Sequence, residues 1–481
     1  MSGMSGPRVA VVGGGLAGIA AALSLADGGA QVTLLERRQR LGGLTWSFQR
    51  HGLSFDNGQH VFLRCCEAYL RFIDRIDAHD AVFLQPRLDI PVLSPDGTRS
   101  SITRGSLPAP LHLASALAHY RHLGMGDRLR LAWPALALSR LDPDDPALDT
   151  TTFGAWLSRH GQSDRAIERL WNLIALPTLN VPASEASLAL AVKVFRTGLL
   201  DQANAGDVGW ATVPLSELHG DHAARALDKA GVEIVLGAGV QGISARCDAG
   251  FDVVTDGQSQ FVDAVVVATP PDVTRRLVPG GVLPADDGLG QSPIVNVHLV
   301  LDRQVTDLAL AAVVDSPIQF VFDRTASSGL RSGQCLSISL SAADGYIAQS
   351  SAQLVRVFFA ALQALLPIAR TARLVDGVVT RERAATFRGI PGTAALRPPS
   401  HTILPDLYLA GAWCATGWPA TMEGAVRSGE SAAHAVLKQG SPAGPVRSER
   451  PVRPVRPVRP VRPARAGRPA RPPRWLEKVA L

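Results

Sequence analysis

Two apolar runs near the amino end of the chain are separated by glycines and a short polar turn. Residues 9–12 predict a buried β-strand, residues 17–26 a helix and residues 32–35 a second strand. A strand, a helix and a strand in this order are typical of a parallel α/β sheet. The chain is therefore predicted to begin with a βαβ unit.

Further strands are predicted much later in the chain. The apolar runs 232–235 and 261–269 extend the first sheet, and the run 407–411 ends in a glycine turn that leads into another helix. The runs 294–301 and 318–323 predict a second sheet. The strands of the first sheet thus come from segments that lie far apart in the sequence.

The middle of the chain is predicted to be helical. Residues 105–140 are rich in leucine and alanine, with a break at Gly124–Gly126 and with interleaved arginines. This pattern fits an ordinary helix pair that faces a core, and it fits equally a helical element at a membrane surface. Residues 151–200 add further helices, which we expect to form a cap on the sheet.

Charge divides the chain into two unequal parts. Residues 441–481 hold 11 Lys and Arg against 2 Asp and Glu, which leaves 37 against 40 for residues 1–440. The larger part is therefore mildly acidic, and nothing in it predicts binding to nucleic acid. The repeated PVR pattern of the tail predicts disorder, and its arginines suit contact with an anionic membrane surface.

The cysteines and histidines give no metal-binding pattern. Five cysteines contain no CxxC pair, and an odd, irregular set of this kind favours a reduced, cytoplasmic setting. The histidines lack the spacing and the supporting cysteines of a metal site, so none is predicted. Because no segment offers about 18 uninterrupted apolar residues, we expect no membrane-spanning helix.

The first βαβ unit contains the pattern Gly13-x-Gly15-x-x-Gly18, with Glu36 at the end of its second strand. Gly13 permits a tight turn, Gly15 lets a pyrophosphate approach the backbone, and Gly18 lets the helix pack closely on the sheet. The helix amino terminus then carries the phosphate charge, and Glu36 accepts the ribose hydroxyl groups. The unit therefore predicts a dinucleotide site.

Two further segments indicate which dinucleotide binds at this site. The pair Gly42–Gly43 resembles the extra glycine pair of FAD-dependent oxidases and desaturases. Residues 55–60, Phe-Asp-Asn-Gly-Gln-His, combine a small residue with clustered polar groups. This segment is either a plain polar turn or a loop close to the isoalloxazine ring, and we favour the loop.

Three separated motifs together resemble the FAD-dependent amine oxidase and phytoene desaturase superfamily. They are GGGLAG at 13–18, VVVATPP at 265–271, and LYLAG followed by GWPATMEGAVRSG within 407–429. The segments DNGQH at 56–60 and WNLIALPTLNVPASEAS at 171–187 look like the squalene-associated branch, the bacterial hydroxysqualene dehydroxylases of hopanoid biosynthesis. The resemblance covers about residues 8–437 and leaves out the tail.

The resemblance implies FAD as cofactor and a set of residues that hold it. It implies that the pyrophosphate meets Gly13, Gly15 and Gly18, the adenosine ribose Glu36, and the far side of the phosphate Gly42 and Gly43. It further implies that adenine meets the backbone of Val240, a turn residue after the strand 232–235, and that the ribityl and pyrimidine end meets Gly411, Thr421 and Met422.

Two positions depart from the superfamily pattern. Ala412 stands where an acidic residue usually binds the cofactor, and Leu44 stands where an arginine usually follows the glycine pair. Hydrogen bonds to charged groups contribute about 1.5–3 kcal/mol each. We therefore expect weaker FAD binding through an otherwise intact backbone cradle.

The fold implied is α/β, with a discontinuous Rossmann-like FAD-binding domain, a second α+β substrate domain with a helical cap, and a disordered tail rich in proline and arginine. The predicted divisions are residues 1–90, 206–285 and 396–440 for the FAD-binding domain, 91–205 and 286–395 for the substrate domain, and 441–481 for the tail.

The resemblance implies reductive removal of the hydroxyl group of hydroxysqualene, which gives squalene. This reaction needs a proton donor beside the leaving oxygen and a dry apolar channel. Candidate donors are His60, Asp56 and Glu423, and Trp413 and Trp418 are candidates for the walls of the substrate pocket. A hydrophobic isoprenoid substrate also suits peripheral contact with a membrane.

Other functions stay open. A phytoene or carotenoid desaturase uses the same scaffold in the oxidative direction. Amine oxidation is disfavoured, because the strand at 294–302 lacks the lysine that this branch usually carries. A non-catalytic isoprenoid-binding protein is the third alternative. The oligomeric state and the reductant of the flavin are not fixed by these patterns.

Overall fold

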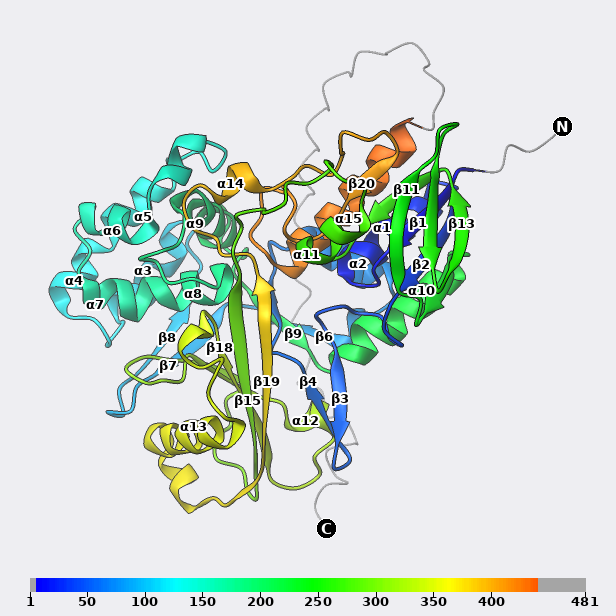
Figure 1. Ribbon diagram of the computed structural model, residues 1–481. Helices are drawn as coiled ribbons and strands as arrows, with labels where there is room; N and C mark the ends of the chain where they lie inside the picture. Colours follow the sequence, from blue (N-terminus) through cyan, green and yellow to red (C-terminus); the bar gives the residue numbers. More distant parts are fainter. Residues whose placement is uncertain (1–5, 440–481) are drawn as a thin grey trace, which may run out of the picture. The chain divides into compact units, whose positions relative to one another are not determined.

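The computed structural model describes residues 6–439. The first strands of the chain lie in a five-stranded parallel sheet (Figure 1). In spatial order its strands are β10 (Glu233–Leu236), β2 (Gln31–Glu36), β1 (Arg8–Val12), β14 (Ala264–Val267) and β20 (Leu407–Leu409). The strands predicted at 9–12 and 32–35 are confirmed, as is the helix between them, α1 (Leu16–Asp27). The sheet is assembled from three separate stretches of the chain.

The two faces of this sheet are covered differently. Val9 and Val11 of β1 belong to the core that includes α1 and α15 (Met422–Gln439). Ala10 and Val12 lie on the opposite face, because successive residues of a strand point to opposite sides. They belong to the core that includes the antiparallel strands β11 (Val240–Ala245), β12 (Phe251–Thr255) and β13 (Gln258–Val262). The sheet is thus buried on both sides, as its apolar strands require.

A seven-stranded sheet forms the second layer. In spatial order its strands are β19 (Leu374–Thr386), β15 (Ser292–Leu301), β18 (Gln334–Leu340), β17 (Phe320–Asp323), β16 (Leu310–Val313), β7 (Asp89–Leu93) and β8 (Arg99–Thr103). All neighbours are antiparallel except β16 and β7. β15 and β17 correspond to the runs predicted at 294–301 and 318–323.

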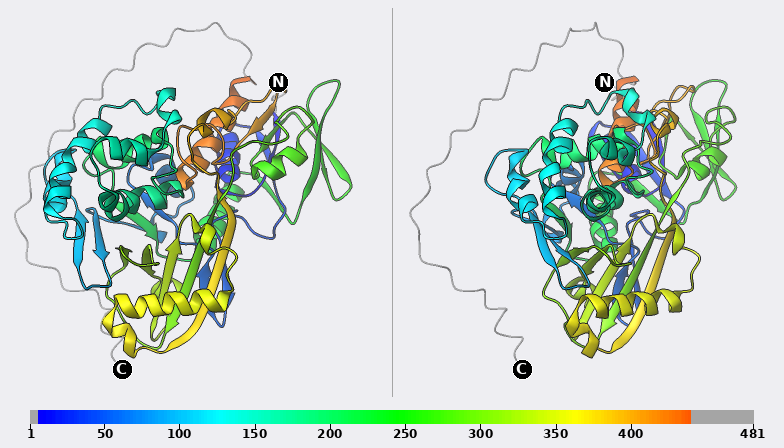
Figure 2. Two further views of the ribbon diagram at one scale, coloured as in Figure 1. Left: turned by 60° about the vertical axis from the view of Figure 1, so that its left-hand side comes forward. Right: turned by 90° about the vertical axis from the view of Figure 1, so that its left-hand side faces the viewer.

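The central strand β15 separates an apolar layer from a polar one. Val295, Val297 and Leu299 belong to the core that includes α13 (Ser351–Leu365), which crosses this face of the sheet (Figure 2). Asn296 and His298 point to the other face by the same alternation, and both are buried. Buried polar side chains need hydrogen-bond partners, so we expect polar contacts on the face of the sheet opposite α13.

The middle of the chain forms a group of helices that lie beside the seven-stranded sheet (Figure 1). They are α3 (Ala114–Ala118), α4 (Met125–Arg130), α5 (Ala132–Leu138), α6 (Phe153–Arg159), α7 (Asp164–Ala166), α8 (Asn172–Leu179) and α9 (Leu188–Phe195), with π-helical turns at Ile167–Trp171 and Arg196–Leu200. The predicted break in the first helical stretch is present before Met125, whereas Gly126 lies inside α4.

Smaller elements complete residues 6–439. They are the hairpin of β3 (Ser47–Arg50) and β4 (Leu53–Asp56), the sheet of β5 (Val61–Leu63), β9 (Val208–Ala211) and β6 (Val82–Leu84), and the helices α2 (Glu67–Arg75), α10 (His222–Lys229), α11 (Pro271–Leu277), α12 (Thr325–Ser328) and α14 (Thr393–Leu396). Single helical turns lie at His79–Ala81, Leu111–Leu113, Pro146–Thr150, Glu217–Asp221, Ala343–Gly345 and Pro367–Thr371.

Two sequence predictions about strands are wrong. The single strand predicted at 261–269 is divided at Asp263 between β13 and β14, which lie in different sheets. The carboxylate of Asp263 accepts a hydrogen bond from the backbone N–H of Arg8 at 2.7 Å, which fixes this switch between sheets. Val240 was predicted to be a turn residue, but it is the first residue of β11. An apolar run cannot reveal such a change of sheet, since the pattern is apolar on both sides.

Residues 6–439 lie within one compact unit, and the predicted division into FAD-binding and substrate domains remains a prediction. The predicted tail, residues 441–481, lies outside the described residues. No helix within residues 6–439 is both long enough and apolar enough to cross a bilayer.

Candidate functional site

The glycine loop after β1 is shaped by close backbone contacts. Gly13 has a φ of +110°, and a Cβ there would lie 2.6 Å from the carbonyl oxygen of Ala268. A Cβ at Gly18 would lie only 1.8 Å from the carbonyl oxygen of Gly13. These two glycines therefore serve the turn and the helix packing that the sequence assigned to them.

The amino terminus of α1 is open. Its first residue follows Gly15, which provides no side-chain cap, and the first turn carries no acidic residue. The unpaired N–H groups at a helix start carry partial positive charge and favour an anion. Gly15 has free space where a Cβ would point, apart from Gly43 at 3.7 Å. A pyrophosphate fits this position.

Glu36 closes the loop at the end of β2. Its carboxylate accepts hydrogen bonds from the N–H of Gly14 at 2.7 Å and of Arg38 at 2.8 Å. Its carbonyl oxygen accepts a hydrogen bond from the N–H of Ala238 at 3.0 Å. This last contact brings the start of β11, where Val240 lies, beside the acid. The two residues predicted for the adenosine end thus lie on neighbouring segments.

The glycine pair covers the loop from a second side. Gly42 donates its N–H to the carbonyl oxygen of Gly14 at 2.8 Å, and both Gly42 and Gly43 have positive φ angles, +96° and +56°. A Cβ at Gly43 would lie 2.8 Å from the Cα of Gly15. The two glycine-rich segments can therefore approach each other only because neither carries a side chain there.

Two arginines that sequence reasoning missed lie at this pair. The guanidinium groups of Arg38 and Arg40 donate to the carbonyl oxygen of Gly43 at 3.4 and 3.2 Å. Burial, and next the positive charge of Arg38, lower the pKa of Arg40 to about 10. Arg38 and Arg40 thus supply positive charge beside Leu44, the position that lacks the expected arginine. The basic run directly after Glu36 was the signal in the sequence.

The loop at 56–60 joins the glycine loops to the second sheet. Asn57 donates its Nδ2 to the carbonyl oxygen of Leu44 at 2.7 Å. On the other side Thr380 of β19 donates its Oγ1 to the carbonyl oxygen of Asn57 at 2.7 Å, and Gln59 donates its N–H to Asn296 of β15 at 3.2 Å. The loop therefore lies between the predicted cofactor cradle and the polar face of β15.

Asp56, a candidate proton donor, is held in a buried ion pair. Its side chain is 8% exposed and accepts hydrogen bonds from Arg324 at 2.8 Å, from the Oγ of Ser47 at 2.7 Å and from the N–H of Leu215 at 3.0 Å. Both oxygens are engaged as acceptors. This arrangement favours a structural role for Asp56.

Glu423, the second candidate, is similarly engaged. It is 1% exposed, and its oxygens accept hydrogen bonds from the N–H groups of Ala68 at 3.2 Å and Tyr69 at 2.7 Å. Arg427 adds an ion pair at 2.6 Å. The carboxylate thus caps the amino terminus of α2 across the interface with α15, which also favours a structural role.

His60 differs from the two acids. Its Nδ1–H donates to the carbonyl oxygen of Gly58 at 3.0 Å, and no hydrogen-bond partner of its Nε2 occurs among residues 6–439. Burial lowers the pKa of His60, which favours the neutral form of the ring. Of the three candidates, His60 alone presents a titratable atom that its neighbours leave available.

Unpartnered polar atoms lie near His60. His219 is fully buried and shares a hydrogen bond with the hydroxyl of Tyr69 at 2.8 Å through Nε2, while its Nδ1 has no partner among the described residues. Burial, and next the nearby His60, lower the pKa of His219 to about 3. Gln59 Oε1 is also buried without a partner in this part of the chain. Buried polar atoms without protein partners are positions where water or a bound ligand can supply the hydrogen bond.

The loop between β20 and α15 supplies the other predicted contacts. Gly411 has a φ of +147° and donates its N–H to the Oγ of Ser428 at 2.8 Å. The Oγ1 of Thr421 accepts a hydrogen bond from the N–H of Gly424 at 3.2 Å, which caps α15. Met422 follows as the first residue of the helix, so its N–H is directed out of the helix start.

Arg397 holds the same loop from behind. It is 7% exposed and donates to the carbonyl oxygens of Ala412 at 3.2 Å, of Trp413 at 3.4 Å and of Cys414. Burial lowers its pKa to about 10. The loop is therefore fixed although Ala412 replaces the expected acid. Nothing in the sequence around Arg397 indicated this role.

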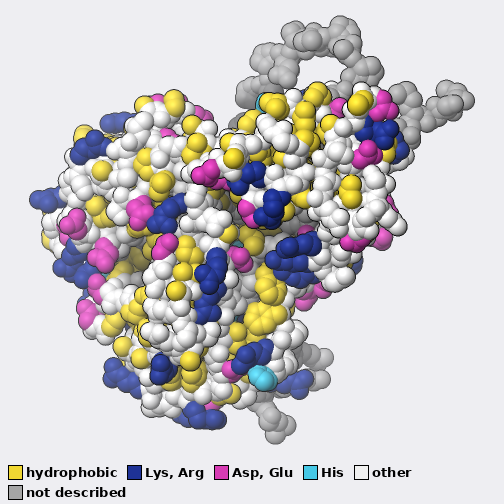
Figure 3. Space-filling model, viewed as in Figure 1, with side chains coloured by type: hydrophobic (Ala, Val, Ile, Leu, Met, Phe, Trp, Pro, Cys, Tyr) yellow, Lys and Arg dark blue, Asp and Glu magenta, His cyan; other side chains and the backbone are white. Residues whose placement is uncertain are grey.

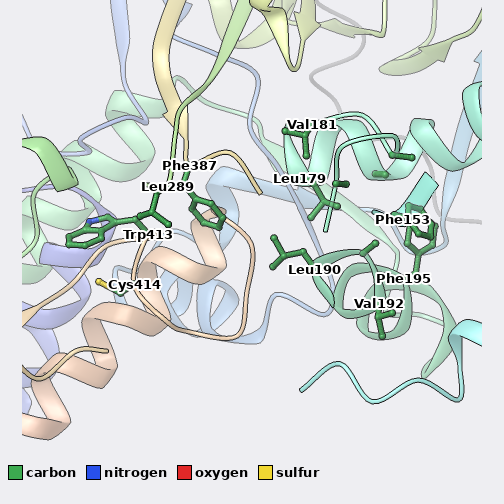
Figure 4. Close-up of a cluster of buried hydrophobic side chains, with 14 of the residues drawn as sticks. Phe153, Leu179, Val181, Leu190, Val192, Phe195, Leu289, Phe387, Trp413 and Cys414 are labelled. Atoms are coloured by element: carbon green, nitrogen blue, oxygen red, sulfur yellow. The ribbon is translucent and has the colours of Figure 1, made fainter. Parts of the chain in front are cut away.

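The two tryptophans predicted for the substrate pocket lie in different surroundings. Trp413 is buried in a cluster of hydrophobic side chains with Leu289 and Phe387, and its Nε1 donates to the carbonyl oxygen of Thr269 at 3.1 Å (Figure 4). Trp418 is half-buried, with Arg427 5.0 Å and Lys193 5.5 Å from its ring centre. A role in the pocket remains a prediction for both.

The arrangement fits FAD better than a metal ion. The open start of α1, the facing glycines and the unpartnered buried polar atoms form a cradle for a large polar ligand. No cluster of three or more potential metal ligands occurs within residues 6–439.

Comparisons with known proteins agree with this assignment. A family described as flavin containing amine oxidoreductase matches residues 16–437. Hydroxysqualene dehydroxylase of Rhodopseudomonas palustris is 30% identical over 442 residues, which cover 90% of this chain and 99% of that protein. The 15-cis-phytoene desaturase of Synechococcus elongatus is 24% identical over 461 residues, covering 89% of this chain and 96% of that protein.

Solved structures show the same fold. Cyclohexylamine oxidase of Brevibacterium oxydans superposes with a TM-score of 0.67 at 18% identity, covering 90% of this chain and 99% of that chain. The predicted α/β fold, the FAD cofactor and the oxidoreductase class are confirmed by these matches. The chain belongs to the flavin-containing amine oxidoreductase family, in the squalene-associated branch that its sequence motifs indicated.

Proposed function

We propose that this chain removes the hydroxyl group of hydroxysqualene reductively and releases squalene. The observation that supports this most strongly is the full-length match to hydroxysqualene dehydroxylase, at 30% identity and 99% coverage of that protein. The match to the desaturase is more distant, at 24% identity. In the reaction the allylic C–O bond breaks, the oxygen leaves with a proton as water, and a hydride forms the new C–H bond.

We assign the cofactor contacts along the loops described above. Gly13, Gly15 and Gly18 with the start of α1 hold the pyrophosphate, and Gly42 and Gly43 cover it. Glu36 and the backbone of Val240 hold the adenosine end, and Gly411, Thr421 and Met422 hold the pyrimidine end. Arg38 and Arg40 contribute the positive charge that Leu44 lacks.

FAD in its reduced form supplies the hydride. The chain's part is to exclude water, to orient the isoprenoid and to deliver a proton to the leaving oxygen. We assign proton delivery to His60, because Nδ1 is fixed on Gly58 and Nε2 is available. With its proton on Nδ1 the neutral ring is an acceptor at Nε2, so Nε2 must first take a proton from solvent water that reaches the site before the isoprenoid closes it, and the imidazolium then gives this proton to the leaving oxygen. The isoprenoid carries no charge, so its orientation depends on shape and apolar contacts.

The test is an anaerobic single-turnover experiment on the full chain. The flavin is reduced with dithionite, hydroxysqualene is added, and flavin reoxidation is followed together with extraction of the product. We expect reoxidation that is coupled to squalene formation. Two results together would contradict the proposal: hydroxysqualene does not reoxidise the reduced flavin, and phytoene reduces the oxidised flavin. They would favour desaturation.

Replacing His60 by phenylalanine tests the proton donor. We expect the single-turnover rate to fall by about 10²–10⁴-fold, as is typical when a general acid is removed, while the flavin content stays the same. His79→Phe is the matched control, because His79 is an exposed histidine with a side chain 61% accessible. If the two variants react at the same rate as the wild type, His60 is not the donor.

A further inference from the structure

An almost continuous helical segment presents an unusual face to solvent. α4 (Met125–Arg130) and α5 (Ala132–Leu138) are joined only by Leu131, which itself has helical angles, with φ −65° and ψ −31°. Residues 125–138 therefore keep nearly one helical periodicity, and positions three or four apart share a face.

Large apolar side chains lie exposed along one stripe of this segment. Met125 is 64% exposed, Leu129 75%, Trp133 59% and Leu136 41%. Their spacings of four, four and three residues place them on the same side of the helix. An exposed apolar stripe of this kind marks a surface that contacts another apolar phase, since isolated surface hydrophobics are ordinary but rows of them are not.

Arginines accompany the stripe along the helical segment, and an acidic loop with Asp142, Asp144 and Asp145 follows it. Within residues 105–140 the chain carries four arginines and one acid, whereas residues 1–440 as a whole are mildly acidic. Arg121, Arg130 and Arg140 are exposed. The single acid, Asp127, accepts a hydrogen bond from the Oγ of Ser163 at 2.8 Å. Hydrophobic, basic and acidic side chains are interspersed along the edge where α4 and α5 lie (Figure 3).

We propose that the α4–α5 face, defined by Met125, Leu129, Trp133 and Leu136, docks on an anionic lipid bilayer. The apolar stripe enters the boundary between headgroups and acyl chains, while the arginines remain at the headgroups, as in interfacial helices. Tryptophan at such a depth is typical of membrane interfaces. A second copy of the chain is a poorer occupant, because two faces of the same positive charge would then meet.

A solvent-open pocket lies among the helices that follow this face. Besides the Asp127 contact, Gln162 donates its Nε2 to the carbonyl oxygen of Arg130 at 3.0 Å, which attaches α4 to the helices that follow. The next turns, with α8, line a cavity of about 200 Å³ against β16 and β17. Leucine, valine, isoleucine and phenylalanine side chains share its lining with polar and charged groups. If the proposed function holds, a lipid substrate leaving the bilayer at this face has near it a pocket with both apolar and charged lining, the latter including Glu168, Arg169 and Asp315.

The experiment measures sedimentation of the full chain with vesicles of phosphatidylcholine, with or without phosphatidylglycerol. The double substitution Leu129→Glu with Trp133→Glu places two carboxylates on the stripe. We expect it to weaken partitioning by about tenfold or more, from the loss of two buried apolar side chains. Because both residues are exposed, the melting temperature is expected to stay unchanged.

Ile403→Glu with Ile368→Glu is the matched control, since these residues are 75% and 58% exposed and lie outside the segment. It is expected to bind vesicles like the wild type. The comparison is repeated at an ionic strength of about 1 M, where the Debye length falls to about 3 Å and electrostatic attraction from any basic segment is screened. The difference between the two double variants is expected to persist there.

Equal binding of both double variants would overturn the proposal. It would also be overturned if the wild type forms a dimer that the Leu129→Glu and Trp133→Glu variant cannot form, without binding vesicles. Neither readout depends on catalysis. Failure of the docking proposal is therefore distinguishable from failure of the proposed dehydroxylation.

Discussion

Replacing Arg324 by methionine is expected to lower the free energy of unfolding by about 3–5 kcal/mol, because it leaves a buried charge without its partner. Arg324 and Asp56 are each 8% exposed at the side chain and lie 2.8 Å apart. Arg324 also donates to the carbonyl oxygen of Ala211 at 2.7 Å, so the substitution removes a second hydrogen bond. Urea unfolding followed by circular dichroism measures the change.

Arg50→Met provides the matched control. Arg50 pairs with Asp376 at 3.0 Å, but its side chain is 46% exposed, and exposed pairs contribute only about 0–1 kcal/mol. Adding Asp56→Asn to Arg324→Met removes the unpaired charge and is expected to recover part of the lost stability. Equal unfolding midpoints for the two arginine variants would show that Asp56 does not depend on its partner.

Replacing Gly18 by alanine is expected to abolish flavin binding and to cost about 3 kcal/mol or more of stability. The added Cβ would lie 1.8 Å from the carbonyl oxygen of Gly13, and neither backbone can move without opening the glycine loop. Gly429→Ala is expected to be similarly severe, since its Cβ would lie 2.1 Å from the carbonyl oxygen of Ala17, where α15 crosses α1. The visible absorbance of the purified protein and its urea midpoint are the measurements.

Gly126→Ala is the control for these two variants. Gly126 lies inside α4, and a Cβ there would meet nothing within 4 Å. Alanine favours a helix over glycine by about 0.5–1 kcal/mol, so this variant is expected to keep its flavin and to gain slightly in stability. A Gly18→Ala protein that purifies yellow with an unchanged midpoint would contradict the assigned close contact.

The sequence predicted those parts of the fold whose structure depends only on residues that are close together in the chain. β1, α1 and β2 follow from apolar runs and from glycines whose packing the structure explains. The division at Asp263 could not be predicted, because its cause is a hydrogen bond to Arg8, which lies 255 residues away. The periodicity of residues 261–269 holds no trace of that contact.

The candidate site shows the same limit. The role of a glycine can be predicted from the sequence, since its conformational freedom is a property of the residue itself. Asp56 and Glu423 were named as possible donors because a carboxylate can donate or accept, and only their partners decide between these roles. Those partners, Arg324 and the amino terminus of α2, are distant in the chain. Arg397 was missed for the same reason, since its task is defined by carbonyl groups of another loop.

The five-stranded sheet has a consequence for biosynthesis. β1 pairs with β2 almost at once, but its other neighbour, β14, comes only after residue 263, and β20 closes the sheet at residues 407–409. Contacts of such long range are slow to form, because loop closure must precede them. During synthesis on the ribosome, the nascent chain therefore carries an unpaired edge of β1 until most of its length has emerged. Flavin capture is then expected as a late event, and it marks a chain that has been synthesised nearly to its end.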